Sequence, residues 1–380
     1  MNLDKTLRNQ LSKVSCDMSM SATLPPACYH DEDIAETERI AVSRASWLGI
    51  GRGDRWPTAG DFAVLSLGGE SVIVLRDTDL ILRAFANTCR HRATALLSGE
   101  GNVARIACPF HGWTYGLDGA LRGATRMGHA PDFAHKNFGL IEFHVAERAG
   151  FAYVCLSPQP PAIEQWLGNF DDYHDGWPLA SLVTTRYREF EVNCNWKLFL
   201  EVFNESYHLD YVHADTFGGL YLEPDPPDRS TGCVHTQFSP TNGTGGLKKD
   251  EQKHSLPMMP GVSGRNREGS RYSWIFPSIT FAAGSEALWA YDAQPISAAR
   301  CRVTQWVCFP PETIAAPDFD KKAQRYYQRM DEALDEDISV LEAQQRGMSS
   351  PNAQQGRWSE LENGASMFAA WYAKCMLSGG

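Results

Sequence analysis

Two short segments each combine one cysteine with one histidine, and their spacing constrains this chain more than any other feature of its sequence. Cys89 and His91 form the first pair and Cys108 and His111 the second, with sixteen residues between the pairs. Two thiolates on one iron and two imidazoles on the other are the ligands of one kind of [2Fe–2S] cluster. A structural zinc site also uses two cysteines and two histidines, but its arms usually pair like with like. We therefore expect an iron–sulfur cluster at these four residues, with zinc as the alternative.

The residues around each pair extend the pattern. They read Cys-Arg-His-Arg at 89–92 and Cys-Pro-Phe-His-Gly-Trp-Thr-Tyr at 108–115. These two arms closely resemble the cluster arms of the Rieske non-haem iron oxygenases, and neither carries the extra cysteine of the Rieske subunits of respiratory complexes. Ala93 stands where the oxygenase pattern more often has glycine, so we expect a small backbone difference there.

A second pair of histidines, His208 and His213, lies in a segment of helical character that begins at Asn195. Residues five apart on an ideal helix differ by about 500°, so the two side chains would point about 140° apart. Because a straight helix cannot direct both at one ion, we expect it to unwind or to carry a π-bulge, a distortion common at functional sites. An isolated pair with this spacing is more often two ordinary histidines.

This segment is similar to the mononuclear iron helix of the same oxygenases. The matching residues are Asn195, Trp196, Lys197, Glu205, Tyr207, His208 and His213. The resemblance implies that His208 and His213 bind a mononuclear Fe(II). It also implies that Glu205, an aspartate in many relatives, links an iron histidine of one subunit to a cluster histidine of its neighbour, and hence that the chain forms a homotrimer.

Non-haem iron oxygenases complete the two-histidine set with one carboxylate. The acidic stretch 330–338 offers candidates on a predicted helix whose apolar stripe is centred near Leu334. Asp331 and Asp337 lie about 60° to either side of that centre and Glu336 about 200° away, so only the two aspartates are expected to face inward. The Glu336-Asp337 pair resembles the acidic helix of the family, which implies Asp337 as the ligand and keeps Asp331 in reserve.

Charge and hydropathy exclude several kinds of partner. The chain of 380 residues has a formal net charge of −11 and a pI near 5.5, which argues against nucleic acid or an anionic membrane as the main partner. No apolar run is long enough for a membrane span, and the first residues lack the core of a signal peptide. The remaining cysteines show no paired spacing, as expected for a reducing compartment. We expect a cytoplasmic protein without a membrane anchor.

The expected fold is α+β and divides into three segments. Residues 1–42 form an N-terminal arm with a helix, residues 43–160 an antiparallel β domain for the cluster, and residues 161–380 an α+β catalytic domain with an antiparallel sheet and helices. The boundary at 157–161 follows from three prolines in four positions, which cannot continue a β-ladder. A helix is predicted over 37–47, and the stretch 214–270 reads as a long loop region near the active site.

The resemblance implies the terminal oxygenase of a multicomponent system. Such an enzyme activates O₂ with electrons from NAD(P)H, which a separate reductase and sometimes a ferredoxin deliver. The chain has no G-x-G-x-x-G fingerprint of its own. We expect hydroxylation or oxidative demethylation of a small aromatic substrate, and the pocket is expected to draw on aromatic residues. These are Phe203, Tyr211, Phe217, Trp274, Phe276, Phe281, Trp289 and Trp306.

Two alternatives stay open at this point. The same aromatic residues suit a methylated ammonium group by cation–π contact, so a monooxygenase or demethylase of a carnitine-, betaine- or stachydrine-like compound is the second enzyme hypothesis. A Rieske electron-transfer protein without catalysis is the hypothesis from another class. The intact set of His208, His213 and Asp337 argues against it, because an electron carrier does not need those residues.

Overall fold

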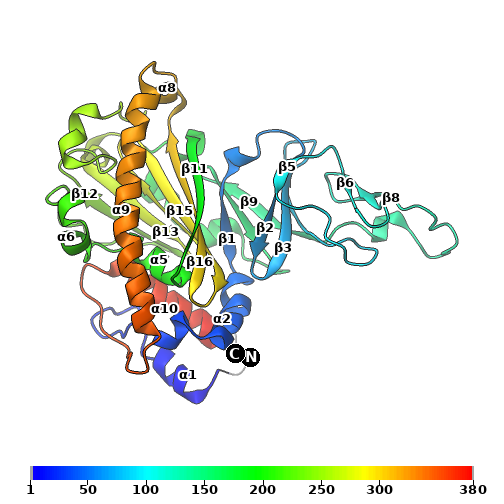
Figure 1. The fold of residues 1–380 in the computed structure, drawn as a ribbon, viewed down its shortest axis with the longest axis horizontal. Helices are drawn as coiled ribbons and strands as arrows, with labels where there is room; N and C mark the ends of the chain where they lie inside the picture. Colours follow the sequence, from blue (N-terminus) through cyan, green and yellow to red (C-terminus); the bar gives the residue numbers. More distant parts are fainter. Residues whose placement is uncertain (1–2, 379–380) are drawn as a thin grey trace. The chain divides into compact units, whose positions relative to one another are not determined.

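The computed structural model describes residues 3–378, and these residues form two compact units. Ser43–Pro160 makes up the smaller unit, and residues 3–42 together with 161–378 make up the larger one. The elements of both are labelled in Figure 1. No helix among residues 3–378 is long and apolar enough to cross a membrane.

The smaller unit is an antiparallel β domain. Its main sheet has seven strands in the order β1-β10-β9-β4-β3-β2-β5, and a second sheet has three strands in the order β6-β7-β8. The strands are β1 (Trp47–Arg52), β2 (Asp61–Leu67), β3 (Glu70–Arg76), β4 (Leu82–Ala86), β5 (Glu100–Asn102), β6 (Ile106–Ala107), β7 (Thr114–Tyr115), β8 (Leu121–Gly123), β9 (Glu142–Arg148) and β10 (Phe151–Cys155).

Strand β3 explains why this sheet has a core on each face. Its run Val72–Leu75 is fully buried, and successive side chains of a strand point to opposite faces. Val72 and Val74 pack into one cluster, whereas Ile73 and Leu75 pack into another that contains Cys89 and the other cluster-arm cysteine. The predicted cluster arms therefore rest on a well-packed hydrophobic core.

The larger unit is built around a six-stranded antiparallel sheet in the order β11-β16-β15-β14-β13-β12. Its strands are β11 (Val183–Val192), β12 (Val234–Pro240), β13 (Gly269–Ile275), β14 (Ile279–Ala283), β15 (Leu288–Ser297) and β16 (Arg300–Phe309). Its helices are α1 (Lys5–Leu11), α2 (Glu32–Glu38), α3 (Ile163–Leu167), α4 (Phe170–His174), α5 (Trp196–Phe203), α6 (Leu209–Val212), α7 (Ala214–Phe217), α8 (Pro311–Ile314), α9 (Phe319–Met348) and α10 (Asn363–Ser378).

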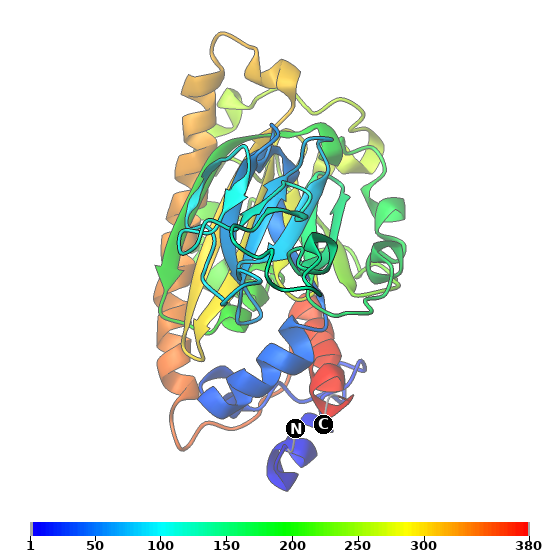
Figure 2. The same cartoon turned by 90° about the vertical axis from the view of Figure 1, so that its right-hand side faces the viewer.

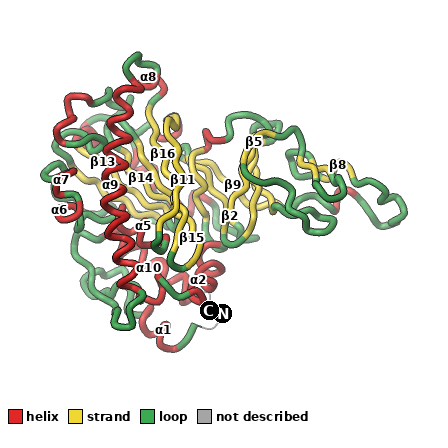
Figure 3. The backbone as a smooth tube through the Cα atoms, viewed as in Figure 1, coloured by secondary structure: helices red, strands yellow, loops and turns green. Residues whose placement is uncertain are grey.

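Helices cover this sheet and enclose the largest core of the molecule. The 30-residue helix α9 runs alongside the strands, as Figures 1 and 3 show. It buries the predicted stripe through Met330, Leu334 and Leu341, while its other faces are charged. Helix α5 lies on the sheet, where Phe199 and Phe203 contact the ring of Tyr291 on β15 at centroid distances of 5.7 Å and 5.0 Å.

A buried acid is among the residues that join the N-terminal arm to the rest of the larger unit. Glu38, at the end of α2, is 3% exposed and accepts hydrogen bonds from Trp196 Nε1 at 2.6 Å and from Tyr372 Oη at 2.8 Å. It also pairs with Lys197, which is fully buried, so the two charges satisfy each other away from water. Figures 1 and 2 both place α2 beside α10.

Two predicted elements differ from the structure. The helix expected over 37–47 starts earlier, because the Asp31 side chain caps α2 by accepting hydrogen bonds from the N–H groups of residues 33 and 34. Trp47 is not helical but is the first residue of β1. The expected loop 214–270 contains strand β12. The polar side chains His235 and Gln237 occupy one face of β12, where a strand pattern would show apolar residues, and both are buried.

Candidate metal centres and substrate cavity

The segment 195–213 folds as two short helices and not as one. Asn195 caps α5 by accepting a hydrogen bond from the Lys197 N–H, and α5 ends at Phe203. His208 precedes the single turn α6 and His213 follows it, with φ −108° and ψ 24° at His213, outside the helical region. The straight helix that would point the two imidazoles apart is therefore interrupted, as the spacing required.

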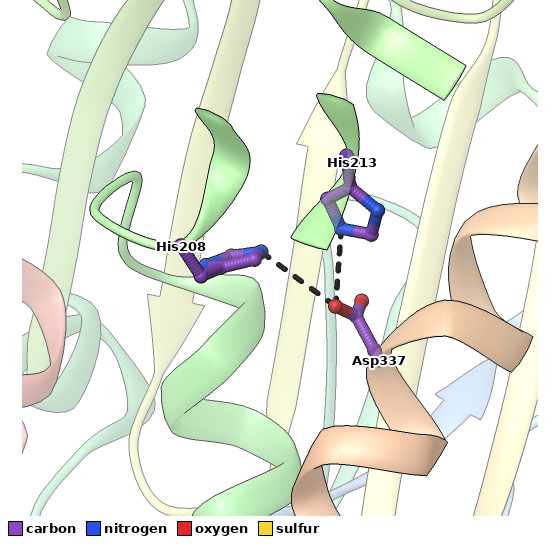
Figure 4. Close-up of side chains that lie close together, drawn as sticks. All are labelled: His208, His213 and Asp337. Atoms are coloured by element: carbon purple, nitrogen blue, oxygen red, sulfur yellow. Dashed lines mark ion pairs between the residues drawn. The ribbon is translucent and has the colours of Figure 1, made fainter. Parts of the chain in front are cut away.

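His208, His213 and Asp337 come together in the larger unit. The Nε2 atom of His213 lies 3.0 Å from Asp337 Oδ1 and that of His208 lies 3.6 Å from the same oxygen, as the dashed lines of Figure 4 show. One ligand atom from each of the three residues lies within 4.8 Å of the others. Asp337 reaches the histidines from α9, which crosses beside α6 and α7.

The outer nitrogen of each imidazole is occupied by a glutamate. His208 Nδ1 donates to Glu205 Oε1 at 2.6 Å, and His213 Nδ1 donates to Glu336 Oε2 at 2.6 Å. Nδ1 carries the donated proton, so a neutral ring at either position would present its Nε2 lone pair toward Asp337. Carboxylates placed in this way fix the orientation of metal-binding histidines and increase their basicity.

The donor set of this site fits a cation. Two Nε2 lone pairs and a carboxylate oxygen face one another, and Asp337 Oδ1 is buried without a hydrogen-bond donor. A proton competes for the same place: burial lowers the pKa of His208, but the Glu205 hydrogen bond and the nearby carboxylates raise it overall. Two imidazoles and one carboxylate are the ligands typical of non-haem Fe(II).

The other acidic residues of α9 have different roles from those expected. Asp331, the reserve ligand, instead pairs with Arg186 at 2.7 Å and with Arg188, and its partners are on β11. Glu336 was expected to point away from the core, but it contacts His213 and also accepts from Thr216. The predicted direction of Glu336 was its angle from the apolar stripe centred near Leu334. Helices α6 and α7 lie on the flank of α9 and not on that stripe, so the angle did not reveal this contact.

The four predicted cluster residues lie in two loops of the smaller unit. The thiols of Cys89 and Cys108 are buried, at 3% and 4% exposure of the residues, whereas both histidines are exposed. The His91 and His111 rings lie 4.7 Å apart between centroids, and the His91 ring stacks on Trp113. This arrangement places the two candidate thiol ligands inside and the two candidate imidazole ligands at the surface.

The two loops have matching backbone hydrogen bonds. Ala93 N–H donates to the Cys89 carbonyl at 2.9 Å, and Gly112 N–H donates to the Cys108 carbonyl at 3.0 Å. Ala93 has φ 59° and Gly112 has φ 70°, so equivalent positions adopt the left-handed conformation in both loops. Alanine adopts this conformation only at a cost, so Ala93 is conformationally strained where Gly112 is not.

The thiols have surroundings that suit metal-bound thiolates. Burial raises the pKa of Cys108, but hydrogen bonds from the backbone N–H groups of Phe110 and His111 outweigh it and lower the pKa overall. Tyr115 Oη lies 3.4 Å from Cys89 Sγ. Hydrogen bonds to cluster sulfur atoms are among the factors that set the potential of such clusters.

A cavity opens beside His208, His213 and Asp337. The space between its walls is about 830 Å³, a figure that includes the part open to solvent. Its wall includes the aromatic residues Phe199, Phe203, Phe217, Tyr221, Tyr272, Trp289 and Tyr291, the polar residues His235, Gln237 and Ser239, and Arg329.

Strand register explains which of the expected aromatic residues reach this cavity. Tyr272 pairs with Ala282, and Ala282 pairs with Trp289, so these three share one face of the sheet. Phe281 pairs with Ala290, which pairs with Trp306, and this row lies on the opposite face. Phe281 and Trp306 were therefore wrongly expected in the pocket.

Three more of the expected residues lie elsewhere for different reasons. Trp274 shares the cavity face of the sheet but stacks on Phe368 of α10 at 4.2 Å, and Phe276 contacts the same ring at 5.4 Å. Tyr211 is 83% exposed. Phe203, Phe217 and Trp289 do line the cavity, and Tyr272, Tyr291 and Arg329 were missed.

Both parts of the chain match known protein families. Residues 46–134 match the Rieske [2Fe-2S] domain, and residues 179–378 match the ring hydroxylating alpha subunit (catalytic domain). Since the second match spans just over half of the chain, the protein belongs to the family of Rieske oxygenase catalytic alpha subunits. It is an oxygen-incorporating oxidoreductase with a [2Fe–2S] cluster and a mononuclear iron.

Individual relatives are similar over most of the chain. The glycine betaine monooxygenase oxygenase subunit of Pseudomonas aeruginosa is 28% identical, with 96% of this chain and 92% of that protein covered. The carnitine monooxygenase oxygenase subunit of Acinetobacter pittii is 26% identical, with 86% and 85% covered. These relatives are oxygenase subunits, and the present chain is likewise the terminal oxygenase of its system.

Solved structures share the fold. A quaternary ammonium Rieske monooxygenase has a TM-score of 0.79 at 23% identity, with 99% of each chain covered. Naphthalene 1,2-dioxygenase from Rhodococcus sp. also has a TM-score of 0.79, at 20% identity and with 99% of each chain covered. The α+β architecture expected from the sequence is confirmed, and the fold alone does not distinguish between these two substrate classes.

Proposed function

We propose that this protein is the oxygenase component of a monooxygenase that acts on a quaternary ammonium compound. The structural observation behind the proposal is the aromatic wall beside the candidate iron site, and the similarity to ammonium monooxygenases favours its interpretation as an ammonium site. Phe203 contacts Tyr272 at 5.4 Å and Tyr291 at 5.0 Å between ring centroids, and Tyr272 contacts Trp289 at 6.3 Å. Tyrosine and tryptophan faces attract methylated ammonium groups by cation–π interaction.

The relatives named above support the same substrate class. Subunits that act on glycine betaine and carnitine are similar along most of this chain, whereas the dioxygenase resemblance concerns the fold. The aromatic substrate first expected from the sequence is therefore replaced by its alternative, a betaine- or carnitine-like compound. An aromatic cluster suits both substrate classes, and the relatives favour the ammonium compounds.

In this proposal His208, His213 and Asp337 hold the iron, which supplies O₂ activation when bound. Glu205 and Glu336 keep both imidazoles in the tautomer that offers Nε2. Cys89, His91, Cys108 and His111 hold the cluster. Glu205 serves further as the link to the cluster of a neighbouring subunit, which makes the protein a homotrimer supplied by a separate NAD(P)H reductase, with or without a ferredoxin. A cytoplasmic location stays a prediction.

Metal analysis and a substrate panel test the proposal together. Iron and acid-labile sulfide are quantified in the purified protein, and the dithionite-reduced form is examined by EPR. We expect about three irons and two sulfides per chain with a Rieske-type signal. Oxygen uptake and formaldehyde or aldehyde release are then followed with a compatible reductase and with glycine betaine, carnitine, choline, benzoate and naphthalene.

Each outcome has a distinct meaning. Turnover of a trimethylammonium compound and none of the aromatic compounds supports the proposal, and the reverse result contradicts it. About two irons per chain and no turnover after addition of Fe(II) would instead support the electron-carrier hypothesis. The variant His208→Ala is the control, because it should lose turnover and retain the cluster signal.

A further inference from the structure

Arg329 is a buried cation in the wall of the cavity. It lies on α9, is 5% exposed, and its Cζ is 4.1 Å from the ring centroid of Phe217 and 5.4 Å from that of Trp289. One of its terminal nitrogens donates to Tyr221 Oη at 2.9 Å. Its Nε is buried and has no hydrogen-bond acceptor.

This guanidinium has no anionic partner among the residues that the structure describes. Within residues 3–378, none of the carboxylates forms an ion pair with Arg329, although Arg325 one turn earlier pairs with Glu251. Arginine cannot lose its proton, and an unpaired charge is costly to bury. Two aromatic faces and one phenol leave part of its donor capacity unused.

Arg329 lines the same cavity as the candidate iron ligands. Arg329 precedes Asp337 by eight residues on one continuous helix, a separation of about 12 Å along the axis. The aromatic residues Tyr272 and Tyr291 line the cavity together with both of them. A ligand that uses the guanidinium and also reaches the iron site therefore needs an anionic end and a reacting end.

We propose that Arg329 binds a carboxylate of the substrate, so that the enzyme selects zwitterionic ammonium carboxylates over simple ammonium cations. The inference rests on the proposed function and makes it more specific. Arg329 forms charge-assisted hydrogen bonds with the carboxylate, and the aromatic wall receives the trimethylammonium group closer to the iron. A ligand with a positive charge alone is repelled by the buried guanidinium. This repulsion discriminates against simple ammonium cations.

Four ligands that differ in only two properties test this assignment. Glycine betaine has both charges, choline has the ammonium alone, 3,3-dimethylbutyrate has the carboxylate alone, and 3,3-dimethylbutan-1-ol has neither. Binding of each is measured by calorimetry on the iron-loaded protein, for the wild type and for Arg329→Gln. Arg325→Gln is the matched control, since its partner Glu251 is not among the residues that line the cavity.

We expect Arg329→Gln to weaken binding of both carboxylates by about 10- to 100-fold, with choline unchanged or bound more tightly. Arg325→Gln should leave all four affinities unchanged. An equal effect of Arg329→Gln on all four ligands, or the absence of carboxylate binding in the wild type, would overturn the assignment. Arg329→Lys keeps the charge and should retain part of the preference for carboxylates, which tests the inference even if the glutamine variant folds poorly.

The same panel separates this inference from the proposed function. If the wild type binds 3,3-dimethylbutyrate at least as tightly as glycine betaine and loses both with Arg329→Gln, the carboxylate site stands and the ammonium preference fails. If the wild type binds choline as tightly as glycine betaine and Arg329→Gln changes neither, the ammonium preference stands and the carboxylate site fails.

Discussion

Glu336 and Asp337 are neighbours in sequence, yet they approach opposite nitrogens of one imidazole. Glu336 Oε2 accepts from His213 Nδ1 at 2.6 Å, and Asp337 Oδ1 lies 3.0 Å from Nε2 of the same ring. The middle of α9 thus supplies both a candidate iron ligand and the residue that fixes the tautomer of another. His208 receives its orienting carboxylate from a different place, Glu205, three residues earlier in its own segment.

Replacement of Glu336 tests this relationship. In Glu336→Gln the neutral amide no longer holds the His213 Nδ1 proton with a charge, and we expect affinity for Fe(II) and turnover to fall by about 10- to 100-fold. The cluster signal should be unchanged. Iron titration and steady-state oxygen uptake measure the effect, and Asp335→Asn serves as the control because Asp335 is exposed on the same helix. Equal behaviour of the two variants would contradict the role of Glu336.

The two aspartates of α9 are expected to behave differently when each is replaced by alanine. Asp337→Ala should lose the mononuclear iron and turnover and keep the cluster spectrum. Asp331→Ala should keep the iron and lose about 1 kcal/mol of stability or less, because its ion pairs with Arg186 and Arg188 are partly exposed. Metal content and thermal unfolding distinguish them, and full activity of Asp337→Ala would exclude it as a ligand.

Substitutions at the equivalent loop positions 93 and 112 are expected to have opposite effects on stability. Ala93→Gly removes the strain of an alanine in the left-handed conformation and should stabilise the smaller unit by about 0.5–1 kcal/mol. Gly112→Ala should destabilise it, although a Cβ at Gly112 meets no atom within 4 Å, so the cost is one of backbone conformation alone. Thermal unfolding followed through the cluster absorbance measures both, and a melting temperature lowered by Ala93→Gly would refute the account.

A buried acid predicts a pH dependence of stability. Burial raises the pKa of Asp292 to about 7, although Gln294 donates to both its oxygens at 2.9 Å and 3.1 Å and opposes the shift. Between about pH 4 and pH 7 the folded state therefore binds more protons than the unfolded state. The contribution of Asp292 to the stability of the folded state is therefore fully present below about pH 4. It is lost as the pH rises through about 7.

The variant Asp292→Asn removes this contribution. We expect the fall in melting temperature between pH 5 and pH 8 to be smaller in Asp292→Asn than in the wild type, with the variant the more stable protein at pH 8. Scanning calorimetry at both pH values provides the measurement, and the exposed Asp335→Asn should retain the wild-type slope. An unchanged slope in Asp292→Asn would assign the pH dependence to other groups.

Short-range patterns predicted the parts of the fold that depend on them. The α9 stripe of Met330 and Leu334 is buried as the helical period requires. The α+β class followed from the cluster arms and the iron helix. Strand β12 escaped detection because His235 and Gln237 face the cavity and replace the apolar residues that mark a strand.

Long-range features of the site were beyond a single sequence. The selection of Trp289 over Trp306 depends on strand register, which places them on opposite faces of the sheet. The Glu336 contact depends on how α6 and α7 lie beside α9. Arg329 belongs to no sequence motif. It is a candidate binding residue because it is buried and has no carboxylate partner within residues 3–378, which only the packed structure reveals.

The division of the larger unit into two stretches of chain constrains the order in which the protein folds during synthesis. The Tyr29 carbonyl accepts from Gln345 Nε2 and the Thr23 carbonyl from Gln355 Nε2, across 316 and 332 residues of sequence. The smaller unit is complete in sequence once Pro160 leaves the ribosome. Residues 3–42, in contrast, can pack fully only after the last helices have been synthesised. Insertion of the [2Fe–2S] cluster can thus precede closure of the catalytic unit, and a nascent chain stalled after residue 160 should already mature its cluster.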